Sequence, residues 1–157
     1  LEWLGNQDSK VRRMTAMLIV EELQKSAPAL LYSHLPSVIS LLCMSLMDPE
    51  IEVRLAAASA LGHCLLLVYE QDQPTQEQTL GPLLETQQQG YRTASIEGLH
   101  ATLLISHSMI KHRCAYMQER FSQTCELALG LKDHHDPVIR EAAISLLPEL
   151  AFCNPQA

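Results

Sequence analysis

The hydrophobic pattern is most regular along residues 48–69. Apolar residues recur there at every third or fourth position, which is the spacing of one face of an α-helix, and they are Val53, Ala57, Leu61, Cys64 and Val68. Asp48 is predicted to cap this helix and Pro49 to take its first position, where a missing N–H costs nothing. Small residues from Ala56 to Ala60 would let another helix approach closely. The pattern predicts a helix over residues 49–69 that is packed against neighbouring helices.

The same helix has three further copies in the chain. An aliphatic residue followed by a charged one aligns the copies, at Val11-Arg12, Val53-Arg54, Ile96-Glu97 and Ile139-Arg140. They start at positions 11, 53, 96 and 139, so their spacings are 42, 43 and 43 residues. The first, second and fourth copies each have an aspartate as a candidate cap: Asp8, Asp48 and Asp136. Proline follows the last two aspartates, as Pro49 and Pro137. The third copy has no such aspartate, and Thr93 or Ser95 is its candidate cap. The chain is therefore predicted to contain four copies of an internal repeat.

The repeated helices are predicted at about residues 9–26, 49–69, 93–110 and 137–152. The last of them is predicted to be kinked at Pro148. Residues 1–4 are predicted to be the tail of a preceding helix. A partner helix over residues 29–47, starting late or kinked near Pro36, is predicted to bury Leu30, Leu31, Leu35, Val38, Leu42 and Leu46. A second partner helix over residues 112–131 carries the apolar stripe Met117, Phe121, Cys125, Ala128 and Leu129. Residues 70–90 are predicted as a variable segment, with a loop at 70–75 and a weak Gln-rich helix interrupted at Gly81-Pro82.

A helix pair every 42 to 43 residues is the size of HEAT and armadillo repeats. Two helices per repeat, with Asp-Pro at the start of the second and Val-Arg just inside it, favour HEAT. Such pairs bury their apolar faces only by stacking on their neighbours. The sequence therefore predicts an all-α, right-handed superhelix of about four helix pairs. Residues 1–157 are interpreted as a single segment of a longer array.

Composition and charge exclude several classes of partner. Hydrophobic residues make up 47% of the chain and aromatic residues only 4%, which suits helices better than strands. The net charge of −7 disfavours a general nucleic-acid surface, and the small cluster Lys10, Arg12 and Arg13 is interpreted as a solvated helix start. Apolar runs such as residues 14–20 are too short to span a bilayer. Five scattered cysteines indicate reduced thiols in an intracellular setting.

Candidate chemistry is sparse. The closest metal-ligating pairs are His63-Cys64 and His112 with Cys114, and neither has a partner pair at the spacing of a zinc site. Phosphate-binding, dinucleotide-binding, nucleophile-elbow and kinase motifs do not occur in the sequence. We therefore predict no catalytic, cofactor-binding or metal-binding residue and no cofactor. The residues singled out are the structural repeat positions Val11, Arg12, Asp48, Pro49, Val53, Arg54, Asp136, Pro137, Ile139 and Arg140.

Several stretches resemble the N-terminal HEAT region of the target-of-rapamycin (TOR) kinases. One is Leu-Glu-Trp-Leu-Gly at residues 1–5, followed by Arg12-Arg13 and the apolar helix that comes after it. Residues 48–65 continue the resemblance in register, and so do residues 113–125 and 144–155. The resemblance covers residues 1–68 and 91–157. Residues 71–90 depart from the family in length and composition, and the join at residues 110–113 is shorter than in relatives.

The resemblance implies a role away from catalysis. TOR proteins are large serine/threonine kinases of the phosphatidylinositol-3-kinase-related family, whose catalytic domain lies at the far C-terminus and therefore outside this chain. Their N-terminal solenoid is a scaffold of a nutrient- and growth-signalling complex, TORC1, in which it contacts a Raptor-like subunit and other parts of the complex. The expected location is cytoplasmic, at endolysosomal or vacuolar membranes through the complex. No nucleic acid and no membrane span are expected.

Three functions are compatible with these features. The first is a non-catalytic scaffold segment of a TOR kinase that makes protein–protein contacts. The second is a HEAT-repeat adaptor of another class, such as a transport or phosphatase scaffold, and a flanking sequence without a kinase domain would favour it. The third is a small helical enzyme or metal protein, which turnover or stoichiometric metal would favour. The ordered resemblance and the lack of site motifs favour the first.

Overall fold

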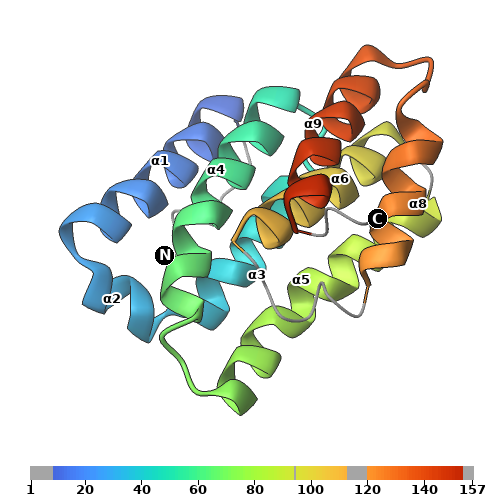
Figure 1. The fold of residues 1–157 in the computed structure, drawn as a ribbon. Helices are drawn as coiled ribbons and strands as arrows, with labels where there is room; N and C mark the ends of the chain where they lie inside the picture. Colours follow the sequence, from blue (N-terminus) through green and yellow to red (C-terminus); the bar gives the residue numbers. More distant parts are fainter. Residues whose placement is uncertain (1–8, 94, 113–119, 154–157) are drawn as a thin grey trace. The chain divides into compact units, whose positions relative to one another are not determined.

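The computed structural model describes residues 9–93, 95–112 and 120–153, and within these ranges every regular element is a helix (Figure 1). The helices are α1 (Lys10–Ser26), α2 (Pro28–Ser33), α3 (Leu35–Leu46), α4 (Ile51–Val68), α5 (Gln73–Thr93), α6 (Ile96–Lys111), α8 (Phe121–Leu131) and α9 (Pro137–Cys153). The prediction of an all-α fold is confirmed. The chain forms two compact units, Leu1–Thr86 and Gln87–Ala157, whose boundary lies inside α5.

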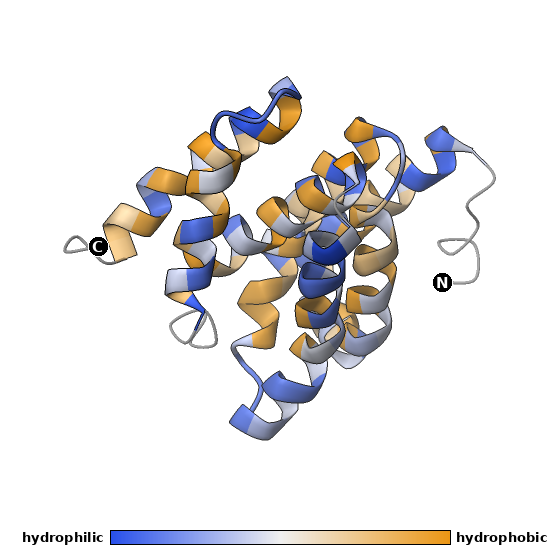
Figure 2. Cartoon of the chain, turned by 90° about the vertical axis from the view of Figure 1, so that its right-hand side faces the viewer, coloured by the Kyte–Doolittle hydropathy of each residue, from blue (hydrophilic) through white to orange (hydrophobic). Residues whose placement is uncertain are grey.

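In the first unit, α4 is the central helix. It packs against α1, which lies beside it in Figure 1, and against α3. The predicted stripe of α4 is confirmed, because each of its members is fully buried: Val53, Ala57, Leu61, Cys64 and Val68. Apolar and polar residues alternate along the helices (Figure 2).

By length and composition α4 could also cross a membrane, since its 18 residues have a mean hydropathy of 1.6. The expectation that the apolar runs are short, as at residues 14–20, is therefore wrong for this helix. Glu52, Arg54 and His63 interrupt the run, but they do not lower its mean hydropathy enough to exclude a span. In the structure 50% of the window is buried, on the side that packs against α1 and α3. Helix α4 is thus placed as a core helix of its unit.

The first partner helix is broken into α2 and α3. His34 lies between them, and Pro36 sits in the first turn of α3, where its missing N–H is tolerated. The predicted kink is confirmed. Five of the six predicted core residues are buried, namely Leu31, Leu35, Val38, Leu42 and Leu46. Leu30 is 52% exposed, contrary to prediction, because the break changes the helical phase and turns Leu31 inward in the short α2.

Helix α5 differs most from the prediction. The expected loop is confirmed only at residues 70–72. A continuous helix of 21 residues takes the place of the rest of that loop and of the interrupted helix, with Pro82 inside it. A proline inside a helix costs roughly 3 kcal/mol. Leu80 and Leu83 are fully buried on either side of Pro82, and this burial offsets the local cost. The Thr86 hydroxyl also donates to the Pro82 carbonyl at 2.8 Å.

In the second unit, α6 and α8 both pack against α9. Of the two predicted caps of α6, Ser95 is the one observed, because its hydroxyl accepts from the Gly98 N–H at 3.0 Å. The other candidate, Thr93, is the last residue of α5. The C-terminal turns of α5 cross α6 closely at Gly90 and Gly98. A Cβ built on Gly98 would lie 2.9 Å from the Gly90 carbonyl oxygen, so only glycine fits there.

Helix α8 ends at Leu131 as predicted but starts at Phe121, whereas the prediction started at residue 112, and residues 113–119 lie outside the described residues. Helix α9 starts at Pro137 as predicted and ends one residue later than predicted. On α8, Ala128 is buried and Phe121 and Cys125 are half-buried, but Leu129 is 54% exposed although predicted to be buried. Met117 lies outside the described residues. Thr124 and Ala128 are the buried residues of α8, and Leu129 lies on another side of the helix. Helix α9 continues past Pro148 to Cys153.

Candidate interaction site

Two of the four repeat copies share one hydrogen-bonding arrangement around an arginine. The Arg54 Nη1 donates to the carbonyl oxygens of Asp48 at 2.9 Å and Pro49 at 3.1 Å. The Arg140 Nη1 donates in the same way to the carbonyls of His134 at 2.9 Å and His135 at 3.1 Å. In both cases the acceptors lie six and five residues before the arginine. The guanidinium thus satisfies carbonyls in the turn before each helix, which would otherwise lack a partner.

The aliphatic residue before each arginine is also equivalent. Val53 and Ile139 are fully buried, and they are 86 residues apart, or twice 43. The Asp-Pro pairs are not in the same register, because Asp48 precedes its arginine by six residues and Asp136 by four. The repeated unit of structure is therefore the aliphatic-arginine pair with its two carbonyls, and the Asp-Pro pair is attached to it at variable distance.

Asp48 does not have the role predicted for it. Helix α4 begins at Ile51, so Pro49 lies before its first turn, and the carboxylate of Asp48 accepts from the Glu50 N–H at 2.9 Å. The other contact of this buried carboxylate is an ion pair with Arg13 of α1. Asp48 therefore joins α1 to the start of α4. By contrast, Pro137 is the first residue of α9, and the Asp136 carboxylate accepts from the Val138 N–H at 2.8 Å.

The other two copies are placed differently. Val11 is 74% exposed and Arg12 is exposed as well, whereas the next residue, Arg13, makes the ion pair with Asp48. The buried stripe of α1 consists of Ala16, Met17 and Val20, so Val11 precedes the packed part of that helix. Ser9 caps α1 by accepting from the Arg12 N–H at 3.2 Å, and Asp8 lies outside the described residues. In the third copy, Ile96 and Glu97 are the half-buried first residues of α6.

The titratable groups offer no activated nucleophile or metal ligand set among the described residues. Burial raises the pKa of the Cys64 thiol to about 12, so this thiol stays protonated at neutral pH. Burial also raises the pKa of Cys43 and of Cys125. In the described part of the chain, no three His, Cys, Asp or Glu side chains are grouped so that they could hold a metal ion. Cys114 lies outside that part.

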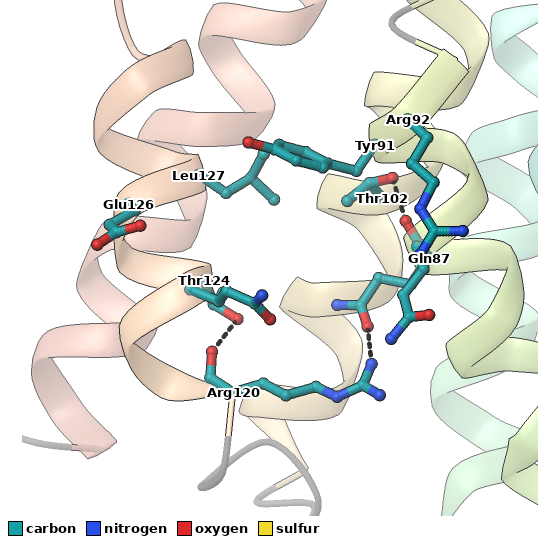
Figure 3. Close-up of a pocket in the computed structure, with 10 residues that line it drawn as sticks. Gln87, Tyr91, Arg92, Thr102, Arg120, Thr124, Glu126 and Leu127 are labelled. Atoms are coloured by element: carbon teal, nitrogen blue, oxygen red, sulfur yellow. Dashed lines mark hydrogen bonds between the residues drawn. The ribbon is translucent and has the colours of Figure 1, made fainter.

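A polar pocket of about 430 Å³ lies in the second unit, between the last turns of α5, helix α6 and helix α8 (Figure 3). Gln87 lines this pocket and joins three neighbouring residues through hydrogen bonds. The Thr102 hydroxyl donates to the Gln87 carbonyl at 2.8 Å, and the Gln87 amide nitrogen donates to the Ser106 hydroxyl at 2.7 Å. The Gln87 side-chain oxygen accepts from the Arg120 Nη1 at 3.3 Å. Because these buried groups are bonded to one another, the wall of the pocket is rigid.

The rim of the polar pocket combines charge with an apolar side. Arg120 extends along one edge toward Gln87, and Arg92 lies on the α5 side (Figure 3). Across the pocket from Arg120, the Tyr91 ring lies beside Leu127, and Glu126 projects from α8 away from the arginines (Figure 3). Sequence reasoning missed this pocket, because its members lie up to 40 residues apart, from Gln87 to Leu127, and share no motif. The one available signal was the run of glutamines at the end of α5.

A second concavity in this unit is apolar. It has a volume of about 540 Å³ and lies between α8 and α9, lined by Phe121, Ser122, Cys125, Leu129, Leu147, Leu150 and Ala151. Phe121, Cys125 and Leu129 belong to the stripe predicted from the sequence as a buried face. Here that face lines an open concavity, which accounts for the exposure of Leu129.

Comparison with known proteins gives a family and several relatives. The HEAT-like repeat family matches residues 9–64. The serine/threonine-protein kinase tor1 of Schizosaccharomyces pombe is 33% identical over 155 residues, which cover 99% of this chain and 7% of that protein. The serine/threonine-protein kinase TOR of Arabidopsis thaliana is 28% identical over 151 residues, covering 96% of this chain and 6% of that protein.

A yeast protein gives a similar match. The serine/threonine-protein kinase TOR2 of Saccharomyces cerevisiae is 28% identical over 163 residues, which cover 99% of this chain and 7% of that protein. The chain thus spans only 6% to 7% of the length of these curated relatives. Each match covers 96% to 99% of the chain.

Proposed function

The chain belongs to the HEAT-repeat part of the TOR serine/threonine-protein kinases, and from that starting point we propose that it is a non-catalytic scaffold segment. Its helices bind protein partners in the assembly of a nutrient- and growth-signalling kinase complex. The partners are a Raptor-like subunit and other parts of that complex. The kinase activity belongs to a part of the parent protein outside this segment. The location is cytoplasmic, at endolysosomal or vacuolar membranes through the complex.

The outward face of α4 is the observation that carries this proposal. Leu55 and Leu66 are 48% and 49% exposed, and at a spacing of eleven residues they lie on the same side of the helix. Between them Ser59 is exposed and Gly62 half-exposed, so the face is flat and open. Two exposed leucines on one face of a core helix give a protein partner apolar surface to cover. Removing such side chains from water on binding contributes about 25 cal/mol per Å².

The test uses the parent protein with both leucines changed, Leu55→Glu and Leu66→Glu. We expect the Raptor-like subunit to be lost when the tagged parent is purified from cells. The matched control is Ser40→Glu, which adds a charge at an exposed polar position of α3. Retention of every subunit by the double variant would contradict the proposal. Loss of the parent's own solubility in both variants would show a folding defect, which circular dichroism of the 157-residue chain would detect.

A further inference from the structure

We propose that the polar pocket binds an acidic side chain from an extended segment of a protein partner, with Arg92 and Arg120 pairing with its carboxylate. This inference rests on the proposed function, because it assigns a partner chemistry to the second unit of the scaffold. The two arginines stand against one carboxylate, Glu126, which projects away from them (Figure 3). The pocket is therefore cationic, although the chain as a whole carries a net charge of −7.

The guanidinium groups of Arg92 and Arg120 have N–H donors that are left for a ligand. Arg120 gives one N–H to Gln87, and Arg92 has no hydrogen-bond acceptor or ion-pair partner among the described residues. A guanidinium carries five N–H donors in a planar fork that fits a carboxylate with two parallel bonds. The contact with Gln87 directs Arg120 along the pocket, and Gln87 is itself fixed by Thr102 and Ser106. Arg120 is thus pre-oriented for a ligand, which reduces the entropy lost on binding.

The apolar side of the pocket makes a peptide a better fit than a free anion. Tyr91 is 60% exposed, and its ring lies beside Leu127 (Figure 3). A free phosphate or acetate would contact the arginines and leave this side uncovered. An acidic residue next to an aliphatic one would use both sides, and a volume of about 430 Å³ is within the usual range for ligand sites. The ligand class is therefore an acidic-aliphatic peptide segment.

A peptide selection tests the site directly, since it lets the pocket choose its own ligand. A random library of displayed octapeptides is selected on the full 157-residue chain, and in parallel on the double variant Arg92→Gln and Arg120→Gln. We expect Asp or Glu beside an aliphatic residue to be enriched on the unchanged chain and not on the variant. The control, Lys25→Gln, removes the same type of charge from α1 in the first unit and should leave the enrichment intact.

Affinity measurements then separate the possible ligands. The most enriched peptide is labelled, and its binding is followed by fluorescence anisotropy beside two versions, one with glutamine and one with phosphoserine at the acidic position. We expect the glutamine version, and each single arginine variant, to weaken binding roughly tenfold, as for the loss of a charge-assisted hydrogen bond. Enrichment without acidic residues, equal binding of the glutamine version, or binding of the phosphoserine version alone would each overturn the proposal.

The outcome is distinct from that of the scaffold test. Peptide selection uses the isolated chain and depends on the second unit, whereas the co-purification test changes α4 in the first unit. If no acidic peptide is enriched while the α4 variant still loses the Raptor-like subunit, the pocket proposal fails and the scaffold proposal stands. If acidic peptides are enriched and the α4 variant retains its subunits, the pocket proposal stands and the assignment of the α4 face as the contact for the Raptor-like subunit fails.

Discussion

At the scale of single residues, the repeat depends on an arginine that satisfies backbone carbonyls. Arg54 is buried and its Nη1 bonds both the Asp48 and Pro49 carbonyls. We expect Arg54→Met to destabilise the chain by about 2 kcal/mol, because it leaves buried acceptors without a donor. Urea unfolding followed by circular dichroism measures the change. Arg12→Met, at the exposed position of the first copy, is the control, and an equal loss in both variants would contradict this role for Arg54.

His107 gives a pH dependence whose sign follows from its surroundings. Burial lowers its pKa, the nearby Glu149 raises it in part, and Lys111 lowers it further. Its folded-state pKa is thus below the unfolded value of about 6.5, so the unfolded chain binds the proton more readily. The stability that His107 contributes is complete above that value and is lost as the pH falls below it. We expect His107→Gln to reduce the loss of stability between pH 7.5 and 5, measured by urea midpoints; an unchanged profile would contradict the assignment.

At the scale of helices, the crossing of α5 and α6 depends on glycine. A Cβ on Gly90 would overlap the Gly98 carbonyl and lie 2.5 Å from the Thr102 hydroxyl, and the backbone cannot move aside as a side chain can. We expect Gly90→Ala to cost about 1–3 kcal/mol, typical of an overpacked site. Gly81→Ala is a matched control in the same helix, since nothing lies within 4 Å of its Cβ, and it should stabilise by about 0.5–1 kcal/mol. Thermal unfolding of both variants checks the pair, and the same sign for both would refute the close crossing.

The helices also show what the sequence could and could not predict. The stripe of α4 was predictable because apolar residues recur at three- and four-residue spacing from Val53 to Val68, and each of them is buried. Helix α5 was not, because its local signals, Pro82 above all, disfavour a helix, and the burial of Leu80 and Leu83 overrides them. The exposure of Leu30 followed from the break at His34, whose position the pattern indicated only approximately.

The polar pocket was beyond sequence reasoning for a different reason. Its polar network joins residues 15 to 33 positions apart, from Gln87 on α5 to Thr102 on α6 and Arg120 just before α8. No short motif marks it, and the acidic overall charge points away from an anion-binding site. Only the packing of the second unit brings the two arginines to one pocket.

At the scale of the whole molecule, Cys64 reports the opening of the first unit. Its thiol is fully buried in the stripe of α4, and burial raises its pKa to about 12, so a thiol reagent meets neither an accessible sulfur nor a thiolate. Cys153, by contrast, is exposed at the end of α9. We expect iodoacetamide to label Cys153 at once and Cys64 only at the rate at which the unit unfolds, as read by mass spectrometry of peptides. Labelling of Cys64 should rise with urea in step with the loss of helix.

Ala57→Glu, which places a charge in the same buried stripe, should speed labelling of Cys64 and not of Cys153. Rapid labelling of Cys64 in the unchanged chain would mean that α4 is not held in a closed core, and the assignment of its stripe as the packed face would then be wrong.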